Sequence, residues 1–328
     1  MKIALALLFH RTREGLRLTR PKAQMPMQYY EPNFIGEALV VLDRFGERAK
    51  VLAGGTLLGP HLRVNPDAAD ALVNLKRITE LSEIRLDGDA LLVGALATAR
   101  SIARDPLVTI HAPLLAAAAS SLGAPQLRTV ATIGGNVLST HHAADMACAL
   151  LACDATATVA KLDDEVLTVP VGQMLSPAFA GLRAGSLLAG FRIPIAVESV
   201  DRKGRPLQGR PLPRLSAFEK MQTRQAFELA LVSVCASVRR QPDGGVAEAR
   251  IALGGAAQTP IRAIAAERAM AGGDMSDARI ARAAHAAADV DAEPCDDDRA
   301  SAAYRRQLVR TLVTRALISI RRTIAEGA

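Results

Sequence analysis

Two segments of the sequence place consecutive glycines directly after a hydrophobic run. The first reads Ala53-Gly54-Gly55-Thr56-Leu57, and the second reads Ala131-Thr132-Ile133-Gly134-Gly135-Asn136. Successive glycines permit positive φ, gather several backbone N–H groups into one concavity and let a diphosphate approach closely. Thr56 and Asn136 add side-chain donors. One such segment is most often a simple tight turn, so the prediction of a nucleotide site rests on the pair.

Neither segment has the spacing of the common nucleotide motifs. The nicotinamide fingerprint GxGxxG and the phosphate loop GxxxxGK[ST] are both absent. A site assembled from two segments far apart in the chain needs a fold in which two lobes face each other across the diphosphate.

Other residue types that carry chemistry do not form a recognisable set. No Ser-His-Asp, paired-carboxylate or reactive-cysteine arrangement is evident, so we expect no catalytic side chain. His141 and His142 suggest a metal site, but neighbouring residues rarely both ligate and no HxxE or Cys/His cluster completes the set. Cys148 and Cys153 lie on an apolar segment and are expected to be core residues. With only four cysteines and no CxxC pair, reduced thiols and a cytoplasmic location are expected.

Residues 25–82 have the pattern of a small α/β lobe that would position the first glycine segment. Apolar residues recur at helical spacing from 35 to 45, and Gly46 ends that helix. A strand at 50–53 runs into the glycines, and a strand at 71–75 and a short helix at 78–81 follow.

Residues 83–198 are predicted to form a second lobe around the second glycine segment. It opens with a hairpin, 84–86 and 91–93, around Asp87-Gly88-Asp89. Thr98 can cap one helix, and Gly123 can end another. The remaining elements are helices at 113–122 and 143–151 and strands at 155–160 and 187–193.

The rest of the chain is predicted to be a linker at 199–213, rich in proline, glycine and charge, and a third domain at 214–328. Its expected strands are 215–222, 229–238 and 246–253, and its expected helices are 260–271, 277–290 and 299–324.

Charge does not favour a nucleic-acid partner. The formal charge of the 328 residues is +7, but six basic residues and Glu14 give the first 24 residues a net +5. The remainder is almost neutral, with no tryptophan and no basic stripe. The apolar run at 3–9 is too short to span a membrane, and no cleavage site follows it. We expect residues 1–24 to be a disordered extension or the product of an upstream start codon.

Taken in order, these segments resemble the FAD-binding (medium) subunits of the molybdenum hydroxylases, the xanthine dehydrogenase, carbon monoxide dehydrogenase and aldehyde oxidoreductase family. The resemblance covers about residues 27–320 and rests on colinear motifs. They are Val51 to Leu58, Thr132 to Asn136, Leu188 to Pro194, Ala217 to Ala230, and Arg250 to Arg262 with its Leu253-Gly254-Gly255.

The resemblance implies an α+β chain with a vanillyl-alcohol-oxidase-like (PCMH-type) FAD-binding fold of two α/β lobes and a C-terminal domain with a small antiparallel sheet and helices. It implies that FAD is held here, while a large subunit carries molybdopterin and a small one carries 2Fe-2S clusters. Electrons would leave to NAD, a quinone or oxygen. The residues implied to line the FAD are Ala53, Gly54, Gly55, Thr56, Leu57, Leu58, Leu122, Gly123, Leu127, Ala131, Thr132, Gly134, Gly135, Asn136, Ser139, Asp145, Leu188 and Lys220.

Departures from the family pattern keep alternatives open. The family often has an acidic residue at the position of Leu57 and Ser-Pro at the position of His141-His142. Asp145 opens a helix, where it could accept a ribose hydroxyl or simply complement the helix dipole. The extra 4Fe-4S cluster of 4-hydroxybenzoyl-CoA reductase flavin subunits is expected to be absent. A stand-alone reductase like that for UDP-N-acetylenolpyruvoylglucosamine would need a serine and a glutamate that cannot be placed, and a scaffold that has lost FAD is the third class.

Overall fold

Two parallel strand pairings organise the N-terminal lobe. The structure, a computed structural model, describes residues 27–139, 141–162, 165–176, 185–195, 214–224, 228–241 and 244–326. The expected extension at 1–24 and the expected linker at 199–213 lie outside these ranges. Strands β1 (Gln28–Tyr30), β2 (Ala49–Leu52) and β3 (Ala71–Asn74) form a parallel sheet in the order β1-β3-β2.

Helix α1 (Ile35–Phe45) has the predicted bounds because both local signals act together. Ala38, Leu39 and Leu42 point inward at helical spacing, and Gly46 ends the helix with φ of 54°. The helix packs between β3 and strand β8 (Ser186–Pro194) of the next sheet. Helix α2 (Leu58–Val64), which buries none of its residues, was not predicted. The expected helix near residue 80 is a 3-10 turn, Thr79–Ser82.

The second lobe is built on a five-stranded antiparallel sheet in the order β4-β5-β8-β6-β7. Strands β4 (Ile84–Asp87) and β5 (Ala90–Gly94) form the predicted hairpin, with Gly88 at φ of 59°. Strands β6 (Thr156–Lys161) and β8 were also predicted. Strand β7 (Val166–Pro170) was missed, because only Val169 is buried and its hydrophobic pattern is weak.

Short helices cover this sheet and carry the second glycine segment. Thr98 caps the first of them, its Oγ1 accepting the N–H of Ser101 at 3.1 Å as predicted. Helix α8 is buried along its whole length. The helices are α3 (Ala99–Arg104), α4 (Pro106–His111), α5 (Pro113–Ser120), α6 (Pro125–Arg128), α7 (Ile133–Leu138), α8 (Asp145–Ala152) and α9 (Val171–Met174).

The C-terminal part is a four-stranded antiparallel sheet in the order β12-β11-β10-β9, with three helices. Its elements are β9 (Leu215–Met221), β10 (Val232–Arg240), β11 (Val246–Gly254), β12 (Ile261–Arg262), α10 (Ile264–Met270), α11 (Asp277–Ala286) and α12 (Ala302–Glu326). The three long strands and the three helices were predicted, with ends that differ by a few residues. Residues 261–262, expected to open a helix, instead form β12.

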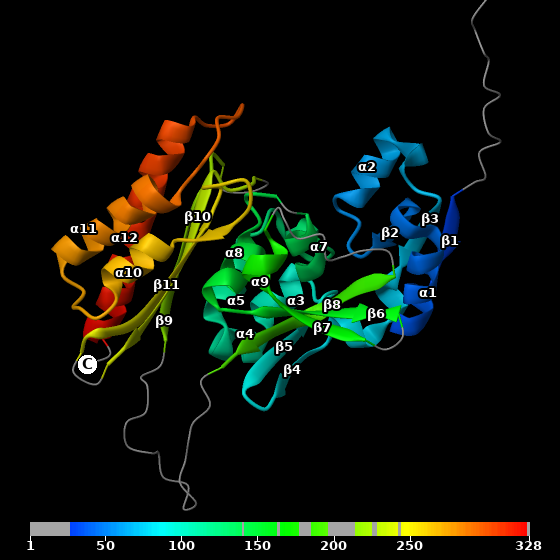
Figure 1. Ribbon diagram of the computed structural model, residues 1–328, viewed down its shortest axis with the longest axis horizontal. Helices are drawn as coiled ribbons and strands as arrows, with labels where there is room; N and C mark the ends of the chain where they lie inside the picture. Colours follow the sequence, from blue (N-terminus) through cyan, green and yellow to red (C-terminus); the bar gives the residue numbers. More distant parts are fainter. Residues whose placement is uncertain are drawn as a thin grey trace, which may run out of the picture.

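This C-terminal sheet is covered on both faces. Helices α10, α11 and α12 lie on one face, while α5 and α8 of the second lobe contact the other (Figure 1). Strand β10 is therefore buried from residue 232 to residue 238 on both faces. Cys235 and Ala252 belong to the hydrophobic core that α8 shares. The C-terminal sheet thus completes the hydrophobic core of the second lobe.

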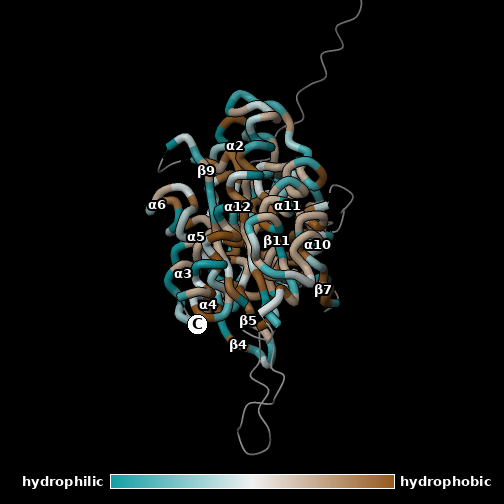
Figure 2. The backbone as a smooth tube through the Cα atoms, turned by 90° about the vertical axis from the view of Figure 1, so that its left-hand side faces the viewer, coloured by the Kyte–Doolittle hydropathy of each residue, from teal (hydrophilic) through white to brown (hydrophobic). Residues whose placement is uncertain are grey.

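Hydrophobic segments gather toward the middle of the molecule, and hydrophilic ones lie mostly at its periphery (Figure 2). The buried apolar residues fall into three clusters, one for each sheet with its helices. Within the described ranges, no helix combines the length and hydropathy that crossing a bilayer requires.

Candidate functional site

The two glycine segments are in direct backbone contact. A Cβ atom on Gly54 would overlap the carbonyl oxygen of Val130 and lie 3.2 Å from the Cα of Ala131. Only glycine permits this approach. Two segments far apart in the sequence therefore form one surface, the arrangement that a shared nucleotide site requires.

The first segment presents unused backbone donors. Gly55 has a positive φ of 71°, which turns the chain between β2 and α2. Among the described residues, the N–H groups of Gly54 to Leu57 donate to no acceptor. Leu57 is 62% exposed. Ala53, Thr56 and Leu58 are half-buried beside it. A row of free N–H groups at a glycine turn is suited to phosphate oxygens.

The second segment works differently from the prediction. Residues 133–138 form the short helix α7, and neither of its glycines has a positive φ. Gly134 donates its N–H to Ala95 (2.9 Å), and Gly135 donates its N–H to Oγ1 of Thr132 (3.2 Å). The expectation that these glycines expose N–H groups through positive φ is wrong, because the helix cap uses those groups.

The second segment requires glycine because a side chain would not fit against the neighbouring backbone. A Cβ on Gly134 would lie 2.8 Å from the carbonyl oxygen of Ala95. Gly135 is exposed, and a Cβ there would lie 3.0 Å from Oγ1 of Thr132, the atom that caps α7. Ala131 and Thr132 are buried beneath it.

Asn136 is oriented by the neighbouring helix. Its Oδ1 accepts the N–H of Ala147 in α8 (3.3 Å), and its carbonyl oxygen accepts the hydroxyl of Ser139 (2.7 Å). Among the described residues, its Nδ2 donates to no acceptor. The predicted side-chain donor of Asn136 is therefore free, and Ser139 supports its backbone.

Leu122, Gly123 and Leu127 form the turn that connects α5 with this surface. Gly123 has φ of 46°, and a Cβ there would lie 2.6 Å from Cδ2 of Leu127. Leu122 packs partly buried against the second-lobe core. Leu188 is 4% exposed on β8 and belongs to that core.

Asp145 and Lys220 bind each other in the interior. The Nζ of Lys220 lies 2.6 Å from Oδ2 of Asp145, and the side chains are 7% and 4% exposed. Nζ also donates to the carbonyl oxygen of Ser121 at 3.1 Å. Burial raises the pKa of Asp145, although the Lys220 charge acts in the opposite direction. Asp145 is the acidic residue in the first turn of α8, as the sequence allowed, but it is buried and paired with Lys220.

A third side chain faces this pair. The hydroxyl of Ser233 on β10 interacts with the carboxylate of Asp145 and lowers its pKa. The pairing of Asp145 with Lys220 joins α5, α8 and β9, and nothing in the local sequence around either residue indicated it.

The four cysteines and the two neighbouring histidines are the remaining candidates for chemistry. No group of three His, Cys, Asp or Glu side chains among the described residues is arranged to hold a metal ion. Cys148 and Cys235 are buried free thiols. Burial raises the pKa of Cys153 to about 12, so its thiol is unreactive. The prediction of core residues is confirmed for Cys148, whereas Cys153 is only partly buried against that core.

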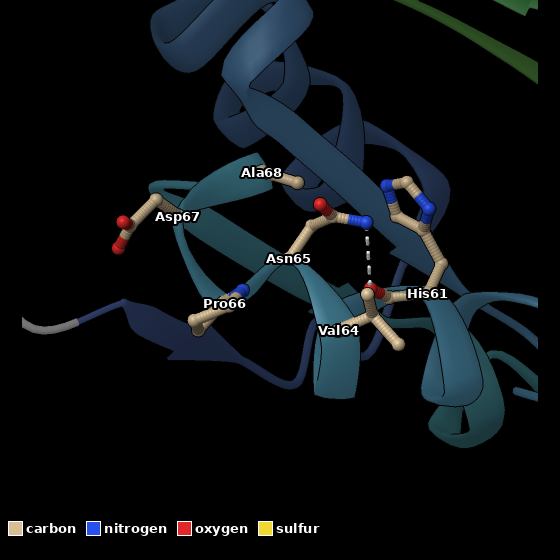
Figure 3. Close-up of a pocket in the computed structure, with 6 residues that line it drawn as sticks. All are labelled: His61, Val64, Asn65, Pro66, Asp67 and Ala68. Carbon is tan, nitrogen blue, oxygen red and sulfur yellow. Dashed lines mark hydrogen bonds between the residues drawn. The ribbon is translucent and has the colours of Figure 1, made fainter.

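A depression of about 510 Å³ lies elsewhere, on the surface of the first lobe (Figure 3). Its lining comes from α2 and the turn after it, between His61 and Ala68. In Figure 3 the Asn65 amide donates to the carbonyl oxygen of His61, at 3.4 Å. None of the predicted site residues lines this depression.

Comparison with known proteins gives a consistent picture. Residues 25–196 match the FAD binding domain in molybdopterin dehydrogenase, and residues 216–320 match the CO dehydrogenase flavoprotein C-terminal domain. The carbon monoxide dehydrogenase medium chain of Hydrogenophaga pseudoflava is 29% identical over 88% of this chain and 95% of its own length. The 6-hydroxypseudooxynicotine dehydrogenase complex subunit alpha of Paenarthrobacter nicotinovorans is 30% identical over 88% and 92%.

Solved structures agree with this. The carbon monoxide dehydrogenase of H. pseudoflava aligns with a TM-score of 0.79 and 29% identity, over 90% of this chain and 96% of that one. Quinoline 2-oxidoreductase from Pseudomonas putida 86 aligns with a TM-score of 0.78 and 26% identity, over 90% and 96%.

Proposed function

We propose, from the premise that this chain belongs to the family of FAD-binding subunits of molybdenum hydroxylases, that it is the electron-transfer subunit of such a complex. In this role it takes electrons from 2Fe-2S clusters of a partner subunit and passes them through FAD to an external acceptor. The chain is an FAD-dependent oxidoreductase subunit, and its fold is the α+β, PCMH-type fold that the sequence predicted.

The single observation that carries the proposal is the contact between the two glycine segments. Gly54 lies against the backbone of Val130 and Ala131, and the free N–H groups of Gly54 to Leu57 face no acceptor of the described chain. These donors, with Nδ2 of Asn136, fit the oxygens of a dinucleotide diphosphate. The residues present therefore fit FAD.

The proposed roles of this chain's residues follow from their positions. Residues 53–58 and Gly135-Asn136 would bind the diphosphate and the adjoining chain of the cofactor. Leu122, Leu127 and Leu188 would exclude water from its rings, and the Asp145–Lys220 pair would hold the α5 turn against the C-terminal sheet. When bound, FAD supplies the redox chemistry, and the protein supplies burial, orientation and a short path to the next redox centre.

The proposed partners are a large subunit with the molybdenum cofactor and a small subunit with 2Fe-2S clusters. Two relatives are named medium chains, and one solved relative is a carbon monoxide dehydrogenase that lacks the Mo-pyranopterin moiety of the molybdenum cofactor. Among the described residues, no three His, Cys, Asp or Glu side chains are arranged to hold a metal ion. We propose that the complex is cytoplasmic and that NAD, a quinone or oxygen accepts the electrons.

Purification of the full chain tests the cofactor assignment. The proposal predicts one FAD per chain, released as free FAD when acid denatures the protein, since no attachment motif is evident in the sequence. Flavin that stayed on the precipitate would contradict non-covalent binding. A colourless chain that does not take up added FAD would support a scaffold that has lost FAD. Co-purification of molybdenum and iron with the tagged chain distinguishes the complex from a stand-alone reductase.

A further inference from the structure

The turn between α7 and α8 is closed by a histidine ring. Nδ1 of His141 accepts the N–H of Ala143 at 3.1 Å, and its carbonyl oxygen accepts the N–H of Ala144 at 3.0 Å. The ring of His142 lies beside it, with 4.4 Å between ring centroids. This turn leads directly into the buried helix α8.

The C-terminal sheet docks on the same turn through its backbone. Gly255 donates its N–H to the carbonyl oxygen of His142 at 2.7 Å. A Cβ on Gly254 would overlap Oγ of Ser233 and lie 3.6 Å from that same carbonyl oxygen. Arg305 of α12 donates to the carbonyl oxygens of Gly255 and Leu231 from the other side. The turn is thus the place where α12, β11 and α8 meet.

His142 stands in a positive and poorly hydrated environment. Its Nε2 is buried, with no hydrogen-bond partner among the described residues. The charged and titratable groups that face it are His141 on its own turn, Asp297 and Arg299 before α12, and Arg305 on α12. The carboxylate of Asp297 binds Arg305 at 2.6 Å. A proton on His142 would therefore meet two guanidinium groups and only one carboxylate, which is already paired.

The turn is also connected to the FAD site. Helix α8 begins right after it, and the N–H of Ala147 in α8 holds Oδ1 of Asn136. The backbone N–H of His141 lies 3.4 Å from Oγ of Ser139, which itself donates to Asn136. A displacement of the turn would move the side chain that we assign to the cofactor.

We propose that the His141–His142 turn is an acid-sensitive latch, which holds α8 and Asn136 in the FAD-binding arrangement only while His142 is neutral. The inference rests on the proposed FAD site, and it adds a pH-dependent control of that site.

The direction of the effect follows from linkage. Burial lowers the pKa of His142 below its ordinary value, and the charges of His141 and Arg305 lower it further. A group with a depressed pKa stabilises the latched state above the pKa of the open state, about 6.5, and that stability is lost as pH falls below it. One proton weakens FAD binding by up to about tenfold per pH unit in that window.

FAD fluorescence of the full chain between about pH 8 and pH 5 tests the latch. The wild type should release FAD increasingly below about pH 6.5. His142→Gln should bind FAD at pH 8 and lose the pH dependence, whereas His61→Gln, on the exposed helix α2, should behave like the wild type. The same dependence in His142→Gln as in the wild type would overturn the latch.

Failure of the latch and failure of the proposed function give different results. A chain that binds no FAD at any pH contradicts the FAD site itself. Calorimetric unfolding of the flavin-free chain then provides a second measurement, the pH dependence of its stability. Its midpoint should fall more steeply with acid in the wild type than in His142→Gln, and equal slopes would contradict the latch.

Discussion

At the residue scale, the contact of Gly54 with the second segment decides whether the two halves of the site can close. Changing Gly54 to Ala places a Cβ onto the carbonyl oxygen of rigid backbone at Val130. The loops must separate, and we expect FAD binding to weaken by at least about tenfold, about 1.4 kcal/mol.

The matched control for this change is Gly59→Ala in α2, where a Cβ would meet nothing within 4 Å. That variant should bind FAD normally and be equally or slightly more stable, because alanine favours a helix. FAD dissociation constants are measured by fluorescence titration. Equal values for the two variants would show that the contact between the glycine segments does not contribute to FAD binding.

The Asp145–Lys220 pair makes a second residue-scale prediction. Asp145→Asn leaves the buried ammonium of Lys220 without its carboxylate, and we expect a loss of about 3–5 kcal/mol in the free energy of unfolding. Glu165→Gln breaks the pair of Glu165 with Lys161, whose side chains are 56% and 33% exposed, and should cost less than about 1 kcal/mol. Denaturant unfolding measures both. A small effect for Asp145→Asn would mean that water reaches the pair.

Residues that act through local backbone geometry could be predicted from the sequence, and residues that act through distant pairing could not. The glycine segments were recognisable because consecutive glycines permit backbone conformations and close approaches that other residues do not. Asp145 and Lys220 are 75 positions apart and meet only because the C-terminal sheet packs on α8. The helical state of Gly134 and Gly135 was missed because Thr132 caps α7, which overrides the usual preference of glycine.

At the scale of elements, the junction of β11 with the α7–α8 turn makes the next prediction. Gly255 has φ of 72°, and a Cβ there would overlap the carbonyl oxygen of Leu231 and lie 3.0 Å from its carbon. Gly255→Ala therefore combines backbone strain of roughly 1–2 kcal/mol with a clash against the sheet.

Comparison with Gly88→Ala separates the clash from the backbone strain. Gly88 has φ of 59° but open space around its Cβ position, so this variant carries the strain alone. We expect Gly255→Ala to be more destabilising than Gly88→Ala by at least about 1 kcal/mol, measured by thermal or denaturant unfolding. Equal losses would show that the sheet relaxes away from the turn without cost.

The segment before α12 makes a pH-dependent prediction. Hydrogen bonding to Arg305 lowers the pKa of Asp297, whose Oδ1 also accepts the N–H groups of Arg299 and Ala300. A depressed carboxyl pKa stabilises the folded state above the unfolded value, about 3.9, and this stability is lost as pH falls below it.

Asp297→Asn should therefore cost roughly 1.5–3 kcal/mol at neutral pH, and the difference from the wild type should shrink below about pH 4. The control is Asp277→Asn, which breaks an ion pair with Arg321 in which Asp277 is 85% exposed; it should cost at most about 1 kcal/mol. A difference for Asp297→Asn that stayed constant with pH would exclude the carboxylate as its source.

Elements with two independent sequence signals were predicted with the best accuracy. Helix α1 has both an apolar stripe and a terminal glycine, and its bounds agree. Strand β7 has one buried residue and was missed, and α2, which buries none, was missed for the same reason. Strand β10 begins three residues later than predicted, because its apolar run continues into a loop.

At the scale of the whole molecule, helix α8 connects the second lobe with the C-terminal sheet. Helix α8 holds Asn136 through the N–H of Ala147 and binds Lys220 of β9 through Asp145. The turn before α8 accepts the N–H of Gly255, which directly follows β11. The C-terminal part therefore completes the proposed FAD site. The order of the segments was predictable from the sequence. The contacts of the C-terminal sheet with α8 and its preceding turn were not, because they depend on buried backbone contacts between glycines and distant carbonyl groups.

The division of labour between subunits is the central claim, and it makes the prediction for the whole chain. A subunit that only relays electrons has no substrate chemistry of its own, so its FAD should not be reduced by an aldehyde, a purine or another candidate substrate. Reduction should require the cognate molybdenum and iron-sulfur subunits, which deliver the electrons.

Anaerobic spectroscopy of the flavin is the most direct measurement of this claim. The FAD-loaded chain, shown to be free of molybdenum and iron, is mixed with the substrate of its complex, first alone and then with the purified partner subunits. The relay account predicts that the visible flavin absorbance stays constant in the first case, bleaches within seconds in the second, and returns when an acceptor is added. Bleaching of the isolated chain at rates typical of enzymes, about 1 per second or faster, would contradict it.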